Sequence, residues 1–376
     1  MLDGLNGRHK PQLKFLSVLF TTIFVCGARL NFSSLARHSE WNEKTYRRHL
    51  RQVFEFSLLN EALSKQANYR IEAFARDASF IKKSGQKTFG LDKFGKGCAG
   101  NAEKGLAVLI IALVNVSQTA SLVLTVDQTE PNLDRKAGTD QDAEQFEKVA
   151  DKILKYTKIG VFDGFYAKKK FVARTVATGL TMISRLRQDA NLRHLSQGPQ
   201  KLEGRRRKFA ETVACNDLRK FAEATIVLDH QEIKLYAATV WSPGLKRNIR
   251  LAVVKCKTKS VNLYSPDLAM TAQELFSYYR SRFSIAFLLR DAKQAGGLSD
   301  CQARDNQALE FHWNAAFTSV NLARGRTNEN RVAGDKQPFS MKSLKQQFYK
   351  EHLLKLFIGK SGLAQSLINT RKLWQV

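Results

Sequence analysis

The chain has 376 residues, of which 43% are hydrophobic, so it is long enough for one large core and one or two accessory domains. Lys and Arg number 61 against 34 Asp and Glu, which gives a formal net charge of +27. A charge of this size favours a polyanionic partner, usually nucleic acid, while an anionic membrane surface is the alternative. The composition excludes an intrinsically disordered chain.

The cysteines are scattered, odd in number and never spaced as Cys-x-x-Cys: Cys26, Cys98, Cys215, Cys256 and Cys301. This pattern predicts free thiols in a reducing cytoplasm and argues against structural zinc. The apolar run 15–27 is shorter than the roughly 20 residues that a membrane span requires. We interpret it as a buried helix, with a signal peptide as the alternative, and expect no membrane partner.

Two short helices are predicted between residues 31 and 56, where Asn31 and Asn42 can serve as caps. The second would bury Tyr46, Leu50 and Val53 and present a basic face made of Lys44, Arg47, Arg48 and Arg51. The pair resembles a helix-turn-helix, which places such a helix on DNA. A small helical dimerisation or packing domain is the alternative.

An α/β region follows. A strand near residues 71–75 delivers Asp77 at its end, and the apolar stretches 106–116 and 120–126 predict an antiparallel pair. A helix over 138–156 precedes a short β-rich run that ends at Asp163. A basic helix and a further strand come next, and the basic side chains of that helix include Lys168, Lys169 and Lys170. Catalytic groups in such sheets tend to lie at strand ends.

Residues 188–265 differ in character, because a Gly/Pro turn and a run of basic residues precede three β-type segments. The basic run comprises Arg205, Arg206, Arg207 and Lys208. It is a candidate phosphate contact, and a solvated surface loop is the alternative.

Residues 271–293 predict one helix. At about 100° per residue, one face within roughly 60° carries Tyr279, Arg282, Ala286 and Lys293. Three of these are polar and the fourth is a bare methyl, a pattern that favours an active-site face. A largely buried helix is predicted from Asn306, then a polar linker over 324–338 and amphipathic helices over 341–358 and 363–373.

Three segments agree in order and spacing with one family: RDASFIKKSG, VFDGFYAKKKF and YYRSRFSIAFLLRDAKQ. They resemble bacterial insertion-sequence transposases of the DDE class, the cut-and-paste group with a Tyr-Arg-Glu-Lys signature. The resemblance covers roughly residues 69–323. It implies an α/β fold with an RNase H-like catalytic core, a β-rich insertion, a helical N-terminal DNA-binding region and a helical C-terminal tail.

The expected division of the chain is an N-terminal region 1–66, a first part of the core 67–187, the insertion 188–265, a second part of the core 266–324 and the tail 325–376. In the family, two aspartates and a glutamate hold two Mg²⁺ ions, for which Mn²⁺ can substitute, and the metal ions activate one oxygen and stabilise another. The resemblance assigns Asp77 and Asp163 to the metal and puts Ala286 at the position of the glutamate. It also assigns Tyr279, Arg282 and Lys293 to the transposon-end DNA.

The resemblance further implies that two protomers pair two double-stranded ends, that excision passes through a hairpin, and that the protein acts at the nucleoid in the bacterial cytoplasm. Each assignment has an alternative. Asp127 competes with Asp77, Asp163 before Gly164 could form a plain Asp-Gly turn, and Arg282 with Lys293 could be solvated charges. Asp291, about 140° from Ala286 on a helix, is a poor replacement for the missing carboxylate.

Ala286 removes one metal ligand and one negative charge. Either the glutamate of an active member was replaced on purpose, or the chain is a natural degenerate copy kept for DNA binding, and we favour the first. Both interpretations predict binding of DNA ends with little or no cleavage. The competing functions are a catalytically dead DNA-binding protein or repressor and a metal-dependent nuclease without strand transfer.

Overall fold

The computed structural model describes residues 10–95, 102–129, 135–196, 204, 206–214, 217–228, 230–255, 260–329 and 338–361. The chain divides into two compact units. The first, which we call the helical unit, comprises Met1–Ala67, Lys87–Phe89 and Leu289–Val376. The second, the sheet unit, comprises Asn68–Gln86 and Gly90–Leu288.

The first half of the sheet unit contains the strands β1 (Ala73–Lys82), β2 (Asp92–Gly95), β3 (Ala102–Asn115), β4 (Ala120–Gln128), β5 (Ile159–Val161) and β6 (Thr181–Leu186). Strand β1 pairs antiparallel with β3 on one side and parallel with β5 on the other. Strand β5 continues in parallel to β6, and β4 pairs antiparallel with β3, as predicted. The neighbours therefore run in the order β4-β3-β1-β5-β6.

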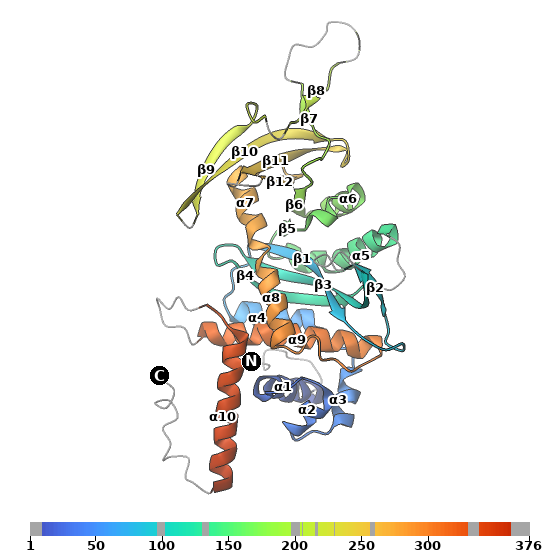
Figure 1. Ribbon diagram of the computed structural model, residues 1–376, viewed down its shortest axis with the longest axis vertical. Coiled ribbons are helices and arrows are strands. Elements are labelled where there is room, and N and C mark those ends of the chain that lie inside the picture. Colours follow the sequence, from blue (N-terminus) through green and yellow to red (C-terminus); the bar gives the residue numbers. More distant parts are fainter. Residues whose placement is uncertain are drawn as a thin grey trace. The chain divides into compact units, whose positions relative to one another are not determined.

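The second half contains β7 (Arg193–Leu195), β8 (Phe209–Thr212), β9 (Ala222–Leu228), β10 (Gln231–Ser242), β11 (Arg247–Lys255) and β12 (Ser260–Ser265). Strands β9, β10, β11 and β12 form an antiparallel meander, which confirms the β-rich character predicted for this part. Because β12 pairs antiparallel with β6, the two halves form one continuous mixed sheet (Figure 1).

Helices cover both faces of this sheet. Helices α5 (Arg135–Leu154) and α6 (Lys169–Ala177) share an apolar cluster with strand residues, and its aromatic members include Phe74, Phe146, Phe162 and Phe171. Helix α7 (Ala272–Ser281) packs through Leu275 on a second cluster that includes Ile183 and Leu263. In β3 every residue from Val108 to Asn115 is buried, on both faces of the strand, which explains why β3 reads as a continuous apolar run instead of alternating.

The helix predicted over 271–293 is interrupted, so the prediction of one continuous helix is wrong. Helix α7 ends at Ser281 and α8 (Ser284–Gln294) begins three residues later. Between them, Arg282 N–H donates to Tyr279 and Ala286 N–H to Phe283, so the turn has tight i→i+3 bonds. The Ser281 hydroxyl also donates to the Tyr278 carbonyl at 2.6 Å, a side-chain bond that competes with the regular helix.

The helical unit contains α1 (Lys10–Val25), α2 (Phe32–Arg37), α3 (Glu43–Leu50), α4 (Phe56–Gln66), α9 (Asn306–Glu329) and α10 (Met341–Ser361). Helix α1 buries Phe15 and Leu16 completely, which confirms the buried helix predicted over 15–27. Helix α9 is buried over most of its length and runs to Glu329, so the linker predicted from Arg324 begins too early. The helix predicted over 363–373 lies outside the described residues.

The caps of α2 and α3 are as predicted. The side chain of Asn31 accepts the N–H of Ser34, and the side chain of Asn42 accepts the N–H of Thr45, each at 2.9 Å. Tyr46 and Leu50 are buried, but Val53 is 78% exposed, because α3 ends at Leu50 and the chain turns away before it. Among the described residues, none of the helices combines the length and apolarity that crossing a bilayer would require.

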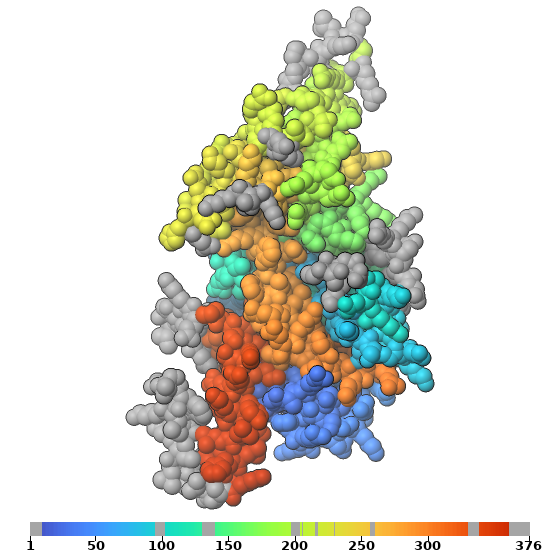
Figure 2. All heavy atoms as spheres, viewed as in Figure 1, coloured from blue at the N-terminus to red at the C-terminus, as the bar shows by residue number. Residues whose placement is uncertain are grey.

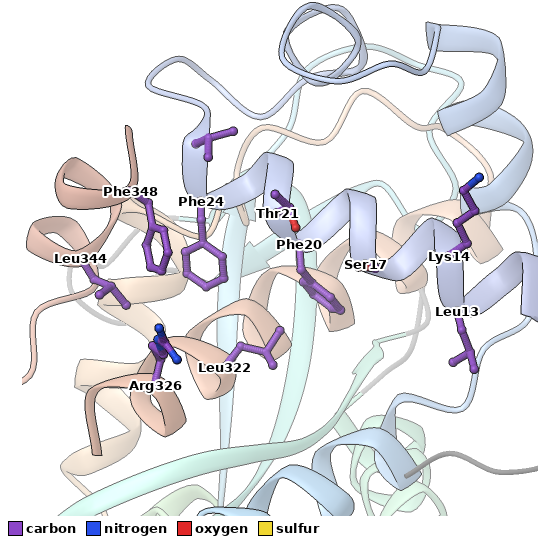
Figure 3. A pocket seen from close by; sticks show the side chains of 11 residues that line it. Leu13, Lys14, Ser17, Phe20, Thr21, Phe24, Leu322, Arg326, Leu344 and Phe348 are labelled. Carbon is purple, nitrogen blue, oxygen red and sulfur yellow. The ribbon is translucent and has the colours of Figure 1, made fainter. Parts of the chain in front are cut away.

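Helices α1, α9 and α10 line an open, mostly apolar pocket of about 610 Å³ (Figure 3). Its walls include the side chains of Phe20, Phe24, Leu322, Leu344 and Phe348, with the cations Lys14 and Arg326 also among the lining residues. Among the described residues that line it, none is a carboxylate, so they offer no ligand set for a hard divalent cation.

Candidate active site

The register of three parallel strands brings three charged residues to one edge of the sheet unit. Ala75, Val161 and Ile183 are neighbours across β1, β5 and β6. Because side chains alternate between the faces of a sheet, the same face two residues later carries Asp77, Asp163 and Arg185. Asp163 lies just beyond β5 but keeps an extended backbone, with φ −72° and ψ 161°. This face is the one that α7 covers, since Ile183 belongs to the α7 cluster.

The prediction that Asp77 ends its strand is wrong, because Asp77 lies in the middle of β1. Asp77 nevertheless lies just beyond the part of β1 that pairs with β5, since that parallel pairing stops at Ala75. On the other side, Asp77 remains in register with Ile110 of β3. Antiparallel pairing with β3 thus fixes the backbone of Asp77, while no strand pairing occupies its backbone on the side toward β5.

Asp163 precedes a single 3₁₀ turn, Gly164–Tyr166, yet its carboxylate makes no capping bond to that turn. Its backbone carbonyl accepts two bonds instead, from Tyr166 N–H at 3.0 Å and from the Ser184 hydroxyl at 2.9 Å. The carboxylate of a structural Asp-Gly turn would be used locally. Here the backbone fixes the turn and the carboxylate is left for another role.

Arg282, at the C-terminal end of α7, lies between the two aspartates. Its Nη1 is 3.4 Å from Asp77 Oδ2, and its Nη2 is 3.8 Å from Asp163 Oδ1. The side chain of Arg282 is only 16% exposed, so it is not a solvated charge. The aspartate side chains are 29% and 50% exposed. One guanidinium thus bridges both carboxylates, and the junction between α7 and α8, orange in Figure 2, reaches the surface here.

Burial and the Arg282 charge shift the pKa values of the neighbouring acidic groups in opposite directions. Burial raises the pKa of Asp77, and the neighbouring Asp163 raises it further, while the Arg282 guanidinium and the N–H of Ala78 lower it. Burial also raises the pKa of Tyr279, against the opposing effect of Arg282. The Tyr279 ring centre lies 5.8 Å from Arg282 Cζ, so tyrosine and arginine contact one another beside the aspartates.

Asp127, the rival of Asp77, faces the other side of the sheet. Asp77 is in register with Ile110 and Val126, whereas Asp127 is in register with Leu109, and Leu109 with Ala78. Alternation therefore puts Asp127 on the face of Arg76, away from Asp163. The electrostatic neighbours of Asp127 agree, because they are Arg76 and Lys148. Asp127 cannot join Asp163 in one metal site.

The Asp77 and Asp163 carboxylates are both partly exposed, and both lie within 4 Å of the Arg282 guanidinium. Such a pair fits a single divalent metal ion. Mg²⁺ is commonly held by one or two carboxylates together with water and substrate phosphate oxygens. Among the described residues, no group of three His, Cys, Asp or Glu side chains is arranged to hold a metal. Asp77 and Asp163 therefore fit one Mg²⁺, and the described chain adds no third carboxylate for a second ion.

Ala286 lies in the first turn of α8 and is exposed. Asp291 does not compensate for it. The side chain of Asp291 is 8% exposed and is neutralised in the helical unit by Arg290 at 3.3 Å and Arg324 at 3.8 Å. Position 286, to which the resemblance assigns the glutamate, thus carries a methyl group, and the next acid in the helix already has two arginine partners.

The lysines that are predicted to contact DNA differ in their exposure and in their partners. Lys169 and Lys170 are exposed at the start of α6, but Lys170 pairs with Asp140, and Lys168 lies 3.8 Å above the centre of the Phe165 ring. Lys293 is exposed in the last turn of α8, within the helical unit.

The two remaining basic groups are on the surface. Arg206, Arg207 and Lys208 are exposed in the segment before β8, and Arg205 lies outside the described residues. In the helical unit, the basic side chains of α3 are exposed as predicted: Lys44, Arg47, Arg48 and Arg51. Two of them have acidic partners, since Arg47 lies 3.5 Å from Glu43 and Arg51 lies 3.3 Å from Asp305.

Sequence reasoning missed Arg185 and Arg76. Arg185 is exposed on β6 and completes the charged row with Asp77 and Asp163. The alternation in Thr181–Leu186 carried the signal, because Ile183 and Arg185 must share a face. Arg76 is fully buried behind the site, where it bonds the Asp142 carboxylate at 3.0 Å. A single arginine beside Asp77 gave no sign of burial in the sequence.

One family model matches the chain. Its description is "Transposase DDE domain", and it matches residues 70–322, which is more than half of the chain. The matched span contains Asp77, Asp163, Arg282 and Ala286. No curated protein sequence matches the chain significantly.

Proposed function

The chain belongs to the transposase DDE-domain family, and from this premise we propose that it is an insertion-sequence transposase that binds the ends of its element and is built for metal-dependent cut-and-paste cleavage and strand transfer. The observation that carries the proposal is the pair of carboxylates, Asp77 and Asp163, on adjacent parallel strands and bridged by Arg282. As written, with Ala286 at the position of the family's glutamate, the chain is catalytically impaired.

Asp77 and Asp163 are the residues that would hold Mg²⁺ or Mn²⁺. When bound, such ions activate the attacking oxygen and stabilise the leaving oxygen of a phosphodiester. The backbone of Asp77 is fixed by β3, and the turn at Asp163 is fixed by two hydrogen bonds to its carbonyl, so both carboxylates are preorganised. Arg282 and Tyr279 are in place to contact a DNA phosphate beside them, as the Tyr-Arg-Glu-Lys signature implies, and Lys293 is proposed as a third contact.

The strand order β4-β3-β1-β5-β6, with β1 parallel to β5 and β6, supports an RNase H-like core. Residues 67–187 and 266–324 would form this core, and residues 188–265 the inserted β-rich part. The flanking regions, residues 1–66 and 325–376, would serve end recognition and assembly. This division is a proposal about function, and it is independent of the two compact units described above.

Double-stranded DNA is the proposed partner, at the element ends and at the target, with two protomers pairing two ends. Exposed basic side chains at three places support it: on α3, at the start of α6 and before β8. Phosphate contacts of this kind make affinity fall steeply with salt. Action at the nucleoid in the bacterial cytoplasm follows from the same proposal. A hairpin at the element end remains part of the family expectation.

A second function is favoured by a specific observation: residue 286 is an exposed alanine, and Asp291, the next acid in α8, is already paired with Arg290 and Arg324. On this account the protein is a catalytically dead descendant that binds DNA, for instance as a repressor. A degenerate copy would carry further inactivating substitutions. If the alanine is engineered or recent, it would be the single inactivating substitution.

The test is a cleavage and strand-transfer assay in Mg²⁺ on the element's own ends, comparing the chain with its Ala286→Glu variant. If only the Glu variant cuts the ends and joins them to target DNA, the chain is a disarmed transposase. If neither cuts while both bind the ends, the DNA-binding descendant is the better account. Cutting without joined products would indicate a metal-dependent nuclease, and cutting by the unaltered chain would contradict the proposed impairment.

A further inference from the structure

Arg282 occupies an unusual position for a DNA contact, because its two terminal nitrogens, Nη1 and Nη2, lie next to the carboxylates that a metal ion would use. The distances are 3.4 Å to Asp77 and 3.8 Å to Asp163. One guanidinium and one divalent cation cannot both be placed between the same two carboxylates, since like charges at such distances repel strongly. Arg282 and the metal therefore compete for Asp77 and Asp163.

The same side chain has a second ligand class available. A guanidinium binds phosphate oxygens in the same planar, two-pronged manner in which it binds carboxylates. Arg282 stands at the end of α7, at a junction with i→i+3 bonds, and it is followed by Phe283, which is 57% exposed. Its Nε has no hydrogen-bond partner among the described residues, although the atom is buried. The guanidinium is thus incompletely satisfied by the two carboxylates.

We infer that Arg282 is an exchangeable ligand that couples metal binding to DNA binding. In the DNA-free protein it neutralises Asp77 and Asp163 and disfavours a divalent cation. A DNA phosphodiester that reaches the site draws the guanidinium to its phosphate, and the carboxylates are then released for the cation. Metal and DNA accordingly bind with positive cooperativity, and Arg282 carries that cooperativity. This inference rests on the proposed function.

The arrangement has a consequence for an enzyme of this class. Without DNA, the site stays neutralised by a side chain instead of by a metal ion, so the metal is held mainly when a phosphodiester occupies the site. Linkage requires the effect to be reciprocal, so that the metal strengthens DNA binding by the same factor by which DNA strengthens metal binding. The loss of the carboxylate at position 286 does not remove this coupling, because Arg282 contacts the two aspartates that remain.

The test measures Mn²⁺ binding to the full-length protein by the paramagnetic resonance signal of free Mn²⁺, first without DNA. Arg282→Gln should bind Mn²⁺ at least tenfold more tightly than the parent, which corresponds to about 1.4 kcal/mol. Arg219→Gln is the matched control. It removes the same charge from an arginine bonded to Asp217 at 2.8 and 2.6 Å, far in the sequence from either aspartate of the site, and should bind as the parent does.

The second arm repeats the titration with a 20-base-pair duplex, and the Mn²⁺ bound by the duplex alone is subtracted. The duplex should tighten Mn²⁺ binding by the parent and by Arg219→Gln, and should leave Arg282→Gln nearly unchanged. Weaker or equal Mn²⁺ binding by DNA-free Arg282→Gln would overturn the inference, as would a DNA effect of full size in that variant.

Asp77→Asn and Asp163→Asn separate the failure of the inference from the failure of the proposed function. If both variants keep the Mn²⁺ affinity of the parent, the carboxylates are not the metal site and the proposed function itself fails. If both lose it while Arg282→Gln gains nothing, the metal site is correct and only the exchange is wrong. Circular dichroism of each variant checks that the fold is retained, so a loss of binding is not a loss of structure.

Discussion

The buried guanidinium of Arg76 lies 5.1 Å from the centre of the Tyr166 ring, on the face of the sheet opposite to Asp77. Arg76 is the neighbour of Asp77 in β1, and Tyr166 ends the turn that begins after Asp163. The contact therefore joins the backbone segments that carry the two aspartates. Arg76 also donates to the Asp142 carboxylate and carbonyl, and the Phe171 ring centre lies 5.6 Å from its Cζ.

Arg76→Met should destabilise the sheet unit severely. Removal of one partner from a buried ion pair leaves the other uncompensated, at a cost of about 3–5 kcal/mol. For a unit of this size, a cost of that order lowers the melting temperature by roughly 6–20 °C. Thermal unfolding followed by circular dichroism measures the change.

Two comparisons make this prediction specific. The double variant Arg76→Met/Asp142→Leu should recover part of the loss, because Asp142 is then no longer left buried without its partner, whereas Asp127 still lacks the Arg76 charge. Arg174→Met, which breaks a partly exposed pair with Glu147, should cost far less. An equal effect of Arg76→Met and Arg174→Met would mean that burial of the Arg76 pair has no special weight.

Local sequence patterns predict several elements of this fold, whereas features that depend on pairing between distant segments cannot be predicted from them. The antiparallel pair of β3 and β4, the meander of β9, β10 and β11, the buried helix α1 and the capping roles of Asn31 and Asn42 follow from local patterns, and the structure confirms them. The break after Ser281 does not follow, because a periodic pattern cannot show one i→i+3 turn. Arg185 and Arg76 became visible only through register, since the face on which a strand residue lies depends on pairing with distant segments.

Asp77→Asn should stabilise the protein at neutral pH. Burial raises the pKa of Asp77 in the folded state, so the folded state holds that proton more tightly than the unfolded state does. The resulting stabilisation is fully present below the unfolded pKa of about 3.9 and is lost as the pH rises through the raised folded pKa. The advantage of Asn over Asp should therefore grow from acidic to neutral pH, as measured by urea unfolding at several pH values.

Asp217→Asn is the control with the opposite sign. The bonds from Arg219 hold the pKa of Asp217 below its usual range, so its ionised form favours the folded state. Its replacement should bring no gain at neutral pH. If Asp77→Asn and Asp217→Asn respond to pH in the same direction, the burial argument for Asp77 is wrong.

Thr271→Ala should weaken α7, the helix that positions Arg282. The Thr271 side chain accepts the N–H of Glu274, and the Glu274 carboxylate accepts the N–H of Thr271 at 2.8 Å, which together form a capping box. Loss of such a cap costs about 1 kcal/mol. The melting temperature should fall by roughly 2–4 °C, whereas Gln273→Ala, an exposed change in the same turn, should leave it nearly unchanged.

Arg185→Gln should weaken DNA binding and reduce its dependence on salt. Arg185 is exposed and continues the row of Asp77 and Asp163 on the face that α7 covers, where a phosphate at the carboxylates would lie near it. Each lost phosphate contact lowers the slope of log K against log salt by about 0.9 for duplex DNA. Fluorescence anisotropy with a labelled duplex at several salt concentrations measures this slope. Arg187→Gln is the matched control, because Arg187 is 85% exposed and already paired with Asp189 at 2.8 Å. A smaller slope for Arg185→Gln with an unchanged slope for Arg187→Gln would place a phosphate at the edge of the sheet, and equal slopes for both variants and the parent would remove Arg185 from the DNA contacts.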